Sequence, residues 1–205
     1  MSTLHMPSLN NTSRGDAPTL SGARRRRLLM NFVLFEAAWF ACVIGASHDG
    51  LAVMAGTGAA LLAVALHVVL SEQPIAELEL AMAAALIGLA WETLLIQIGV
   101  VAVPHGELFA GVAPPWIVAM WALFATTLNY SLGWLRGRWT LAAVLGAIAG
   151  PLSYWAGVRM GALQFIDPVK AVIALAIGWG VATPLLLGLA RRLVDEPTTV
   201  GGEQP

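Results

Sequence analysis

Six apolar runs, each long enough to cross a bilayer, constrain this chain more than any other feature. The hydrocarbon core of a bilayer is about 30 Å thick and a helix rises about 1.5 Å per residue, so about 20 residues span it. We therefore predict an all-α polytopic membrane protein with a six-helix transmembrane bundle. The predicted spans are residues 28–46, 51–70, 79–103, 114–135, 140–158 and 169–190.

The composition agrees with lipid as the solvent. Apolar residues make up 58% of the 205 residues and charged residues only 11%, whereas about 25% of the residues in soluble domains are charged. We expect a transmembrane domain over residues 24–192, between disordered cytoplasmic tails at 1–23 and 193–205 that contain too few apolar residues to fold. The net charge of −1 gives no reason to expect a nucleic acid partner.

The positive charges predict an orientation with both ends in the cytoplasm, because cytoplasmic segments carry an excess of Lys and Arg. In that orientation the outer loops hold only Arg159 and Lys170. The cytoplasmic segments hold Arg14, Arg24, Arg25, Arg26, Arg27, Arg136, Arg138, Arg191 and Arg192. Four tryptophans near predicted span ends suggest an interfacial aromatic belt; they are Trp116, Trp134, Trp139 and Trp155.

The two halves of the chain show a weak likeness. Residues 49–96 pair without gaps with residues 139–186, and Gly56 then matches Gly146 while Gly88 matches Gly178. With three helices per half, a true repeat would be inverted, as in many secondary transporters. The alternative is that membrane helices resemble one another through composition alone.

Two acids near the middle of predicted spans, Glu36 and Glu92, are the most informative residues. A charged side chain at the bilayer centre costs about 2.5 to 3.5 kcal/mol on insertion scales, so such acids usually face the bundle interior and mark a site. The alternative is a protonated carboxyl group that hydrogen-bonds between helices and only holds the bundle together.

Polar side chains in the fourth and fifth spans extend this candidate site. The fifth span also contains Gly150-Pro151 and the sixth contains Thr183-Pro184, and each pair frees backbone carbonyls that need partners inside the protein or at a water-lined cavity. A helix broken in this way would form part of the site; the alternative, and the commoner outcome for a proline in a membrane helix, is a kink that serves packing alone. The candidate intramembrane polar site comprises Glu36, Glu92, Thr126, Asn129, Ser153 and Tyr154. Small residues spaced for close helix packing occur at Gly56 with Ala60 and at Gly146 with Gly150.

The sequence gives no reason to expect a metal or another cofactor. His67 is the only histidine in a predicted span, and it fits a packed or interfacial residue better than a ligand. The single cysteine, Cys42, has no partner for an intramolecular disulfide and fits a buried apolar residue.

Two segments resemble the bacterial membrane family called domain of unknown function 2878. The first runs from Pro114-Pro115-Trp116 through residues 124–135 (FATTLNYSLGWL), and the second covers residues 146–154 (GAIAGPLSY) with Gly161-Ala162-Leu163. The resemblance implies a multi-pass protein of the bacterial inner membrane and no settled mechanism. Many members carry an aspartate in the third helix where this chain has Glu92. Members often neighbour lipid-modifying enzymes, which by association alone favours envelope lipid metabolism.

Three kinds of function fit these observations. Transport of a small solute or a lipid-related molecule would use Glu36 and Glu92 to bind a proton or a cationic group. A membrane-embedded enzyme would use Glu92 as a base with Tyr154, Ser153 or Asn129, but no nucleophile with its own base is evident. An accessory subunit would use its polar residues only to hold helices together, and a homo-oligomer or a membrane-protein partner fits the same sequence.

Overall fold

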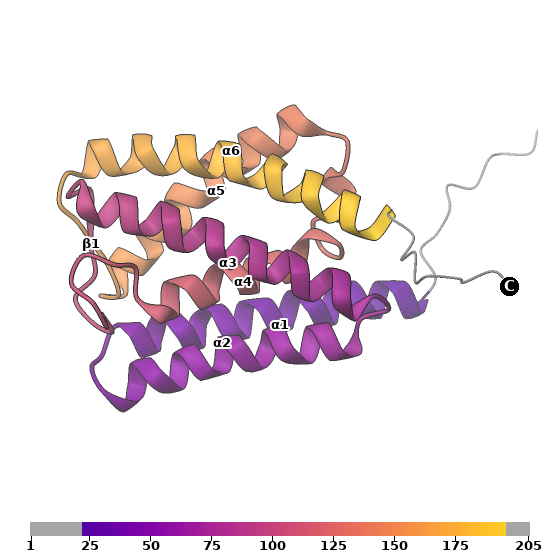
Figure 1. Ribbon diagram of the computed structural model, residues 1–205, viewed down its shortest axis with the longest axis horizontal. Helices are drawn as coiled ribbons and strands as arrows, with labels where there is room; N and C mark the ends of the chain where they lie inside the picture. Colours follow the sequence, from indigo (N-terminus) through magenta and orange to yellow (C-terminus); the bar gives the residue numbers. More distant parts are fainter. Residues whose placement is uncertain (1–21, 196–205) are drawn as a thin grey trace, which may run out of the picture.

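The computed structural model describes residues 22–195, and this part of the chain forms a bundle of six α-helices (Figure 1). The helices are α1 (Gly22–Ala46), α2 (Leu51–Leu70), α3 (Pro74–Gln97), α4 (Pro115–Leu128), α5 (Trp139–Arg159) and α6 (Pro168–Asp195). The all-α prediction is therefore confirmed. Of the tails predicted at residues 1–23 and 193–205, residues 1–21 and 196–205 lie outside the described residues, whereas 22–23 belong to α1 and 193–195 to α6.

Five of the described helices have the length and composition of membrane spans, and α4 is the exception. With 14 residues, α4 is about 21 Å long at about 1.5 Å per residue. The predicted span over residues 114–135 is therefore a shorter helix than expected. Helix α4 is followed by its C-terminal cap residue, Asn129, and the chain then reaches a 3₁₀ turn, η1 (Gly133–Leu135).

The third helix also differs from its predicted span, 79–103. It begins at Pro74, because a proline in the first turn lacks only an N–H that would be unpaired anyway. It ends at Gln97, since Gly99 adopts a φ of 68° that a helix does not allow. As a result Glu77, which the apolar run leaves in a loop, lies in the first turn of α3.

Helix α4 lies at the centre of the bundle, where it packs against α1, α2, α3 and α6. Apolar residues lie on all sides of α4, as expected of a helix that is surrounded by other helices. The fully buried residues include Trp116, Trp121, Leu123 and Leu128. Helix α5 packs mainly on α6 instead. This difference in packing leaves the side of α5 that faces α1 open.

Close helix packing depends on the predicted small residues. A Cβ added at Gly56 would lie 2.7 Å from the Ala41 carbonyl oxygen, so α1 and α2 meet at this glycine. A Cβ at Gly146 would overlap the backbone of Trp179, so α5 and α6 meet there. Each glycine therefore allows two backbones to approach as the sequence pattern indicates.

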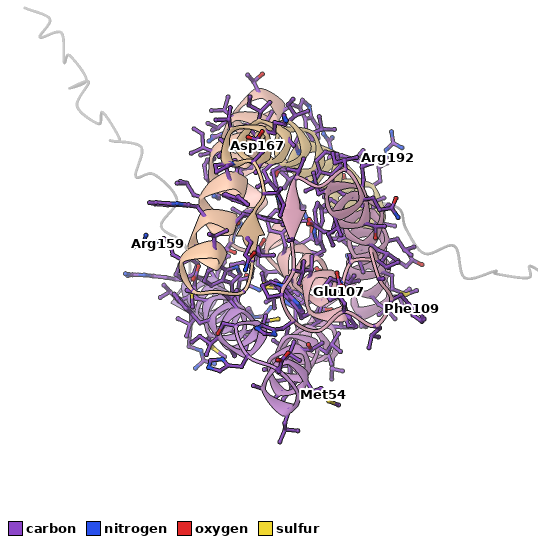
Figure 2. All side chains as sticks on the ribbon, turned by 90° about the vertical axis from the view of Figure 1, so that its left-hand side faces the viewer. Met54, Glu107, Phe109, Arg159, Asp167 and Arg192 are labelled. Atoms are coloured by element: carbon purple, nitrogen blue, oxygen red, sulfur yellow. The ribbon has the colours of Figure 1, made fainter. Side chains whose placement is uncertain are left out.

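Two short strands join distant loops at the end of the bundle opposite the described chain ends (Figure 1). Strand β1 (Val101–Ala102) pairs antiparallel with β2 (Gln164–Phe165), with Val101 opposite Phe165. The pairing ties the α3–α4 loop to the α5–α6 loop. Figure 2 views this end and shows Glu107, Phe109, Arg159 and Asp167 projecting around it.

The helix breaks expected at Gly150-Pro151 and Thr183-Pro184 are absent, because α5 and α6 each continue through their proline. A proline removes the N–H that would bond to the carbonyl four residues earlier, here that of Ala147 and that of Gly180, but the flanking residues remain helical. In α5 the Ser153 hydroxyl donates to the Gly150 carbonyl at 2.9 Å, so this side chain is bonded within its own helix.

The aromatic-belt prediction is wrong for Trp116, which is 1% exposed and donates its indole N–H to the His105 carbonyl oxygen. Its place in α4 explains this, because α4 is surrounded by other helices. By contrast Trp134, Trp139 and Trp155 have exposed side chains, as residues at a membrane interface would.

Candidate functional site

An apolar cavity of about 620 Å³ lies between α1, α4, α5 and α6, and we call it the groove. It forms because α5 packs against α6 rather than against α1 or α4. Aromatic and aliphatic atoms make up most of its lining. Its lining residues include Phe32, Glu36, Trp39, Trp121, Thr127, Ser131, Leu132, Leu135, Leu145, Gly146, Ala149, Gly150, Leu152, Ser153, Tyr154, Trp179 and Thr183.

The groove is open toward the outside of the bundle. Phe32 on α1 and Leu152 on α5 line it and are 51% and 56% exposed. In a membrane such exposed side chains would meet lipid, because helices that face hydrocarbon carry apolar residues there. The geometry therefore offers a lateral opening between α1 and α5.

Glu36 is half-buried on α1 and lines the groove. Within residues 22–195 its carboxyl group makes no hydrogen bond and no ion pair. Thr183 on α6 lines the groove as well, and its buried hydroxyl oxygen has no partner among the same residues. The Trp179 Nε1, on another lining residue, is likewise buried without a partner among these residues, so Glu36 is the unpaired charged side chain of a mainly apolar cavity.

Glu92 is 1% exposed on α3 and lies behind the wall of the groove rather than in it. The Trp121 indole donates to its Oε1 at 3.0 Å, and the Tyr154 hydroxyl donates to the same oxygen. These bonds connect α3 to α4 and to α5 across the interior. Because Trp121 and Tyr154 both line the groove, they separate Glu92 from any occupant.

Stacked aromatic rings form that wall. The rings of Trp121 and Trp179 lie 4.6 Å apart and nearly parallel, at 20°. A Cβ added at Gly88 would overlap Trp121, and one added at Gly150 would overlap Trp179, so each indole lies directly on a glycine. The two glycines thus fix the position of the wall and, through Trp121, the position of the bond to Glu92.

A second set of polar side chains lies at the end of the bundle that carries the chain ends, and we call it the polar network. Its members are Asn31, His67, Glu77, Asn129, Ser131 and Arg136. They come from α1, α2, α3 and the segment after α4, so the network joins four parts of the chain.

Asn31 is the centre of one half of the network. Its amide nitrogen donates to the Thr126 carbonyl oxygen at 3.0 Å and lies 3.4 Å from His67 Nδ1. Its amide oxygen accepts a hydrogen bond from the Ser131 hydroxyl at 3.0 Å. All the polar atoms of this 8% exposed side chain are therefore paired, as buried polar groups require.

Glu77 is the centre of the other half and is 5% exposed. His67 Nε2 lies 3.1 Å from its Oε2, and the Asn129 amide donates to its Oε1 at 2.9 Å. Arg136 donates in turn to the Asn129 amide oxygen. The Arg136 Nε is buried without a partner among the described residues.

The structure divides the predicted candidate site among three places. Glu36, Ser153 and Tyr154 line the groove, whereas Glu92 lies behind it and accepts a hydrogen bond from Tyr154. Asn129 belongs to the polar network.

Thr126 has its hydroxyl bonded within α4 to the Leu123 carbonyl oxygen. Its backbone oxygen is the part that joins the polar network. Of the six candidates, then, Glu92 and Tyr154 are the pair whose side chains hydrogen-bond to each other.

Sequence reasoning missed His67, Glu77, Arg136 and Trp121 as parts of these assemblies. A start of α3 at Pro74 would have placed Glu77 in a helical turn facing α2, and the first-turn preference of proline was the available signal. In the sequence, Arg136 is recognisable only as a positive charge in a predicted loop. No local pattern indicates that Trp121 reaches Glu92, since that contact depends on how α3 and α4 pack.

Among the described residues no group of three or more His, Cys, Asp or Glu side chains is arranged to hold a metal ion. The arrangement supports hydrogen bonding within the bundle and binding of an apolar molecule in the groove.

Comparison with known proteins gives one match. A family described as "Protein of unknown function (DUF2878)" matches residues 28–185, which confirms the resemblance found in the sequence. No curated protein and no solved structure matches the chain.

Proposed function

The chain belongs to the DUF2878 family of proteins of unknown function, and from its structure we propose that it binds a lipid-like amphiphile in the groove and carries it across the membrane. The groove is the observation that carries this proposal. Its volume of about 620 Å³ lies within the range of about 300 to 1,000 Å³ typical of ligand sites.

The lining favours an apolar chain over a small polar solute. A polar solute that enters an apolar site without hydrogen-bond partners loses about 2 to 7 kcal/mol of hydration. The groove offers few polar groups among its aromatic rings, and Glu36 is the acidic side chain in its lining. A hydrocarbon chain needs no such partners and can enter through the opening beside Phe32 and Leu152.

The same geometry argues against Glu92 as a catalytic base for a bound lipid. Its carboxyl group is 1% exposed, and the Trp121 and Tyr154 side chains stand between it and the groove. A general base must come within hydrogen-bond reach of the proton that it removes. The binding proposal therefore rests on the groove, and Glu92 serves it by holding the wall.

We also propose six crossings of a bacterial inner membrane, with both described chain ends on the cytoplasmic side. Figure 1 supports this, because α1 begins and α6 ends at the same end of the bundle. We call this the arginine end; it holds Arg24, Arg25, Arg26, Arg27, Arg136, Arg138, Arg191 and Arg192. The fourth crossing would consist of α4 and the following turn through η1.

The inverted repeat of three helices stays a prediction from the sequence. In the first half α2 packs closely on α1, whereas in the second half α5 packs on α6. The proposed transport does not depend on the repeat.

Thiol labelling tests the orientation. In a Cys42→Ala background, a membrane-impermeant maleimide added to spheroplasts should label Glu107→Cys, which lies at the end shown in Figure 2. It should label Arg192→Cys only after the membrane is permeabilised. Labelling of Arg192→Cys in intact spheroplasts would contradict the proposed orientation.

Quenching of tryptophan fluorescence by a brominated amphiphile tests binding in the groove. The assay uses full-length protein in detergent with Trp134, Trp139 and Trp155 changed to Phe, so that these exposed indoles do not contribute. We expect saturable quenching, which Ala149→Phe should weaken at least about tenfold by filling the groove. Ala90→Phe is the matched control, because Ala90 is also exposed but lies on α3 outside the groove.

Quenching of equal strength in the Ala149→Phe protein would contradict the proposal, because it would show that the amphiphile contacts only the outside of the bundle. A saturable response that is lost in Ala149→Phe and kept in Ala90→Phe would support it. Transport is then measured as transfer of the same amphiphile between the leaflets of reconstituted vesicles.

A further inference from the structure

A second cavity, of about 720 Å³, lies at the arginine end between the start of α1, the start of α3 and the segment after α4. We call it the arginine cleft. Its polar and charged lining residues are Arg24, Arg27, Glu72, Gln73, Glu77, Asn129, Tyr130, Ser131 and Arg136. The lining of the arginine cleft is thus more polar than the lining of the groove.

The arginine cleft and the groove lie next to each other, since Ser131 lines both. Side chains that follow Ser131 in the sequence line either the groove or the arginine cleft. Leu132 and Leu135 line the groove, whereas Trp134 and Arg136 line the cleft. A molecule with an apolar chain and a polar head could therefore occupy both spaces at once.

Charge indicates which head group fits. Both Glu77 oxygens already accept hydrogen bonds within the polar network, and the exposed Glu72 pairs with Arg27. Two arginines that line the cleft, Arg27 and Arg136, therefore present guanidinium groups beside acids whose oxygens already have partners.

Arg136 adds an unpaired donor, because its buried Nε has no partner within the described residues. Guanidinium groups present a planar array of donors that matches phosphate oxygens. The cleft thus offers both the charge and the hydrogen-bond donors that a phosphate needs.

We propose that the amphiphile bound by this protein carries a phosphate head group, which binds in the arginine cleft while the hydrocarbon chain lies in the groove. This inference rests on the proposed function, since it assumes that the groove holds an apolar chain. It adds the chemical class of the ligand. It also places the phosphate at the arginine end, where the positive-inside rule locates the cytoplasmic surface.

Displacement of the brominated amphiphile from the full-length protein tests the inference with three probes. They are short-chain phosphatidic acid, short-chain diacylglycerol and inorganic phosphate. A charge-assisted hydrogen bond contributes about 1.5 to 3 kcal/mol, which corresponds to about 10-fold to 100-fold in affinity. We expect phosphatidic acid to bind at least about tenfold more tightly than diacylglycerol, and inorganic phosphate alone to displace nothing.

Variants locate the phosphate. Arg27→Gln and Arg136→Gln should each weaken phosphatidic acid binding about tenfold or more and leave diacylglycerol binding unchanged. Arg192→Gln is the matched control, because Arg192 is exposed at the same end and does not line the cleft. If Arg136→Gln does not fold, Arg27→Gln decides the result, because the Arg27 side chain is 61% exposed.

The outcomes separate this inference from the proposed function. Equal affinity for phosphatidic acid and diacylglycerol, both weakened by Ala149→Phe, would overturn the phosphate inference and leave binding in the groove intact. Displacement by inorganic phosphate at the same concentration as phosphatidic acid would also overturn it, because the lipid chain would then contribute nothing. If Ala149→Phe changes neither lipid, the proposed function itself fails.

Discussion

Gly88 on α3 is the position where a single added carbon should disturb the interior most. A Cβ there would overlap the Trp121 indole, which would have to shift. Overpacking of this kind costs about 1 to 3 kcal/mol. The shift would also weaken the bond to Glu92, about 1 kcal/mol, and the stacking on Trp179, about 0.5 to 1.5 kcal/mol. We therefore expect Gly88→Ala to lower the free energy of unfolding by about 3 to 5 kcal/mol.

The chain contains its own probe for this measurement. Cys42 is the single cysteine and is fully buried, so a fluorogenic maleimide should react with it only when the bundle opens. With about 2 to 4 °C per kcal/mol for chains of this size, the Tm in detergent should fall by between about 6 and 20 °C. Gly58→Ala is the control, because Gly58 lies inside α2 with nothing within 4 Å of an added Cβ.

We expect the Tm of the Gly58→Ala protein to stay the same or to rise slightly, since alanine favours a helix over glycine by about 1 kcal/mol. If Gly88→Ala leaves the Tm unchanged, the Trp121 indole does not lie on Gly88, and the placement of the groove wall is wrong. A fall of equal size in both variants would mean that the effect comes from the substitution of any helical glycine.

Three further changes test the interior bonds and one helix start. Tyr154→Phe should lower the free energy of unfolding by about 1 kcal/mol in the maleimide assay, because bonds between membrane helices average about 0.6 and reach about 1.7 kcal/mol. Glu92→Leu should cost more, about 2 to 6 kcal/mol, since it leaves the donors of Trp121 and Tyr154 unpaired; a loss no larger than that of Tyr154→Phe would contradict this. Asp167 accepts bonds from the first turn of α6, and the Lys170 N–H and ammonium group hold the pKa of Asp167 below its usual range. Its stabilising effect is therefore present above a pH of about 4 and lost as the pH falls through the lowered pKa, so Asp167→Ala should speed amide exchange in this turn at pH 7 and change little at low pH.

Much of the helical framework follows from local sequence, because spanning length and proline or glycine signals are local. The start of α5 and the whole of α2 lie within one residue of their apolar runs. The bounds of α3 and α4 differ because the runs extend past the helices: Val101 is as apolar in β1 as it would be in a span. Hydropathy alone does not show where a run leaves the helix, whereas the positive φ of Gly99 does.

The polar assemblies could not be predicted because their members are far apart in the chain. Asn31 bonds to Thr126, and Glu92 bonds to Tyr154, across different helices. The sequence identifies these residues as costly in a membrane and therefore as partnered. Which partner each one finds depends on the packing of α4 at the centre, and no periodicity in one helix carries that information.

The small residues of α5 show why the groove was also beyond prediction. Gly146 and Gly150 match a pattern that predicts close contact with another helix, and they do contact α6. One position away, Ala149 and Ser153 present the same small size toward α1, where no helix comes into close contact with α5. Small side chains bring helices together only if a partner is held near, and the contacts between α5 and α6 hold α5 away from α1. The same small-residue pattern therefore produces a tight interface on one side of α5 and the open groove on the other.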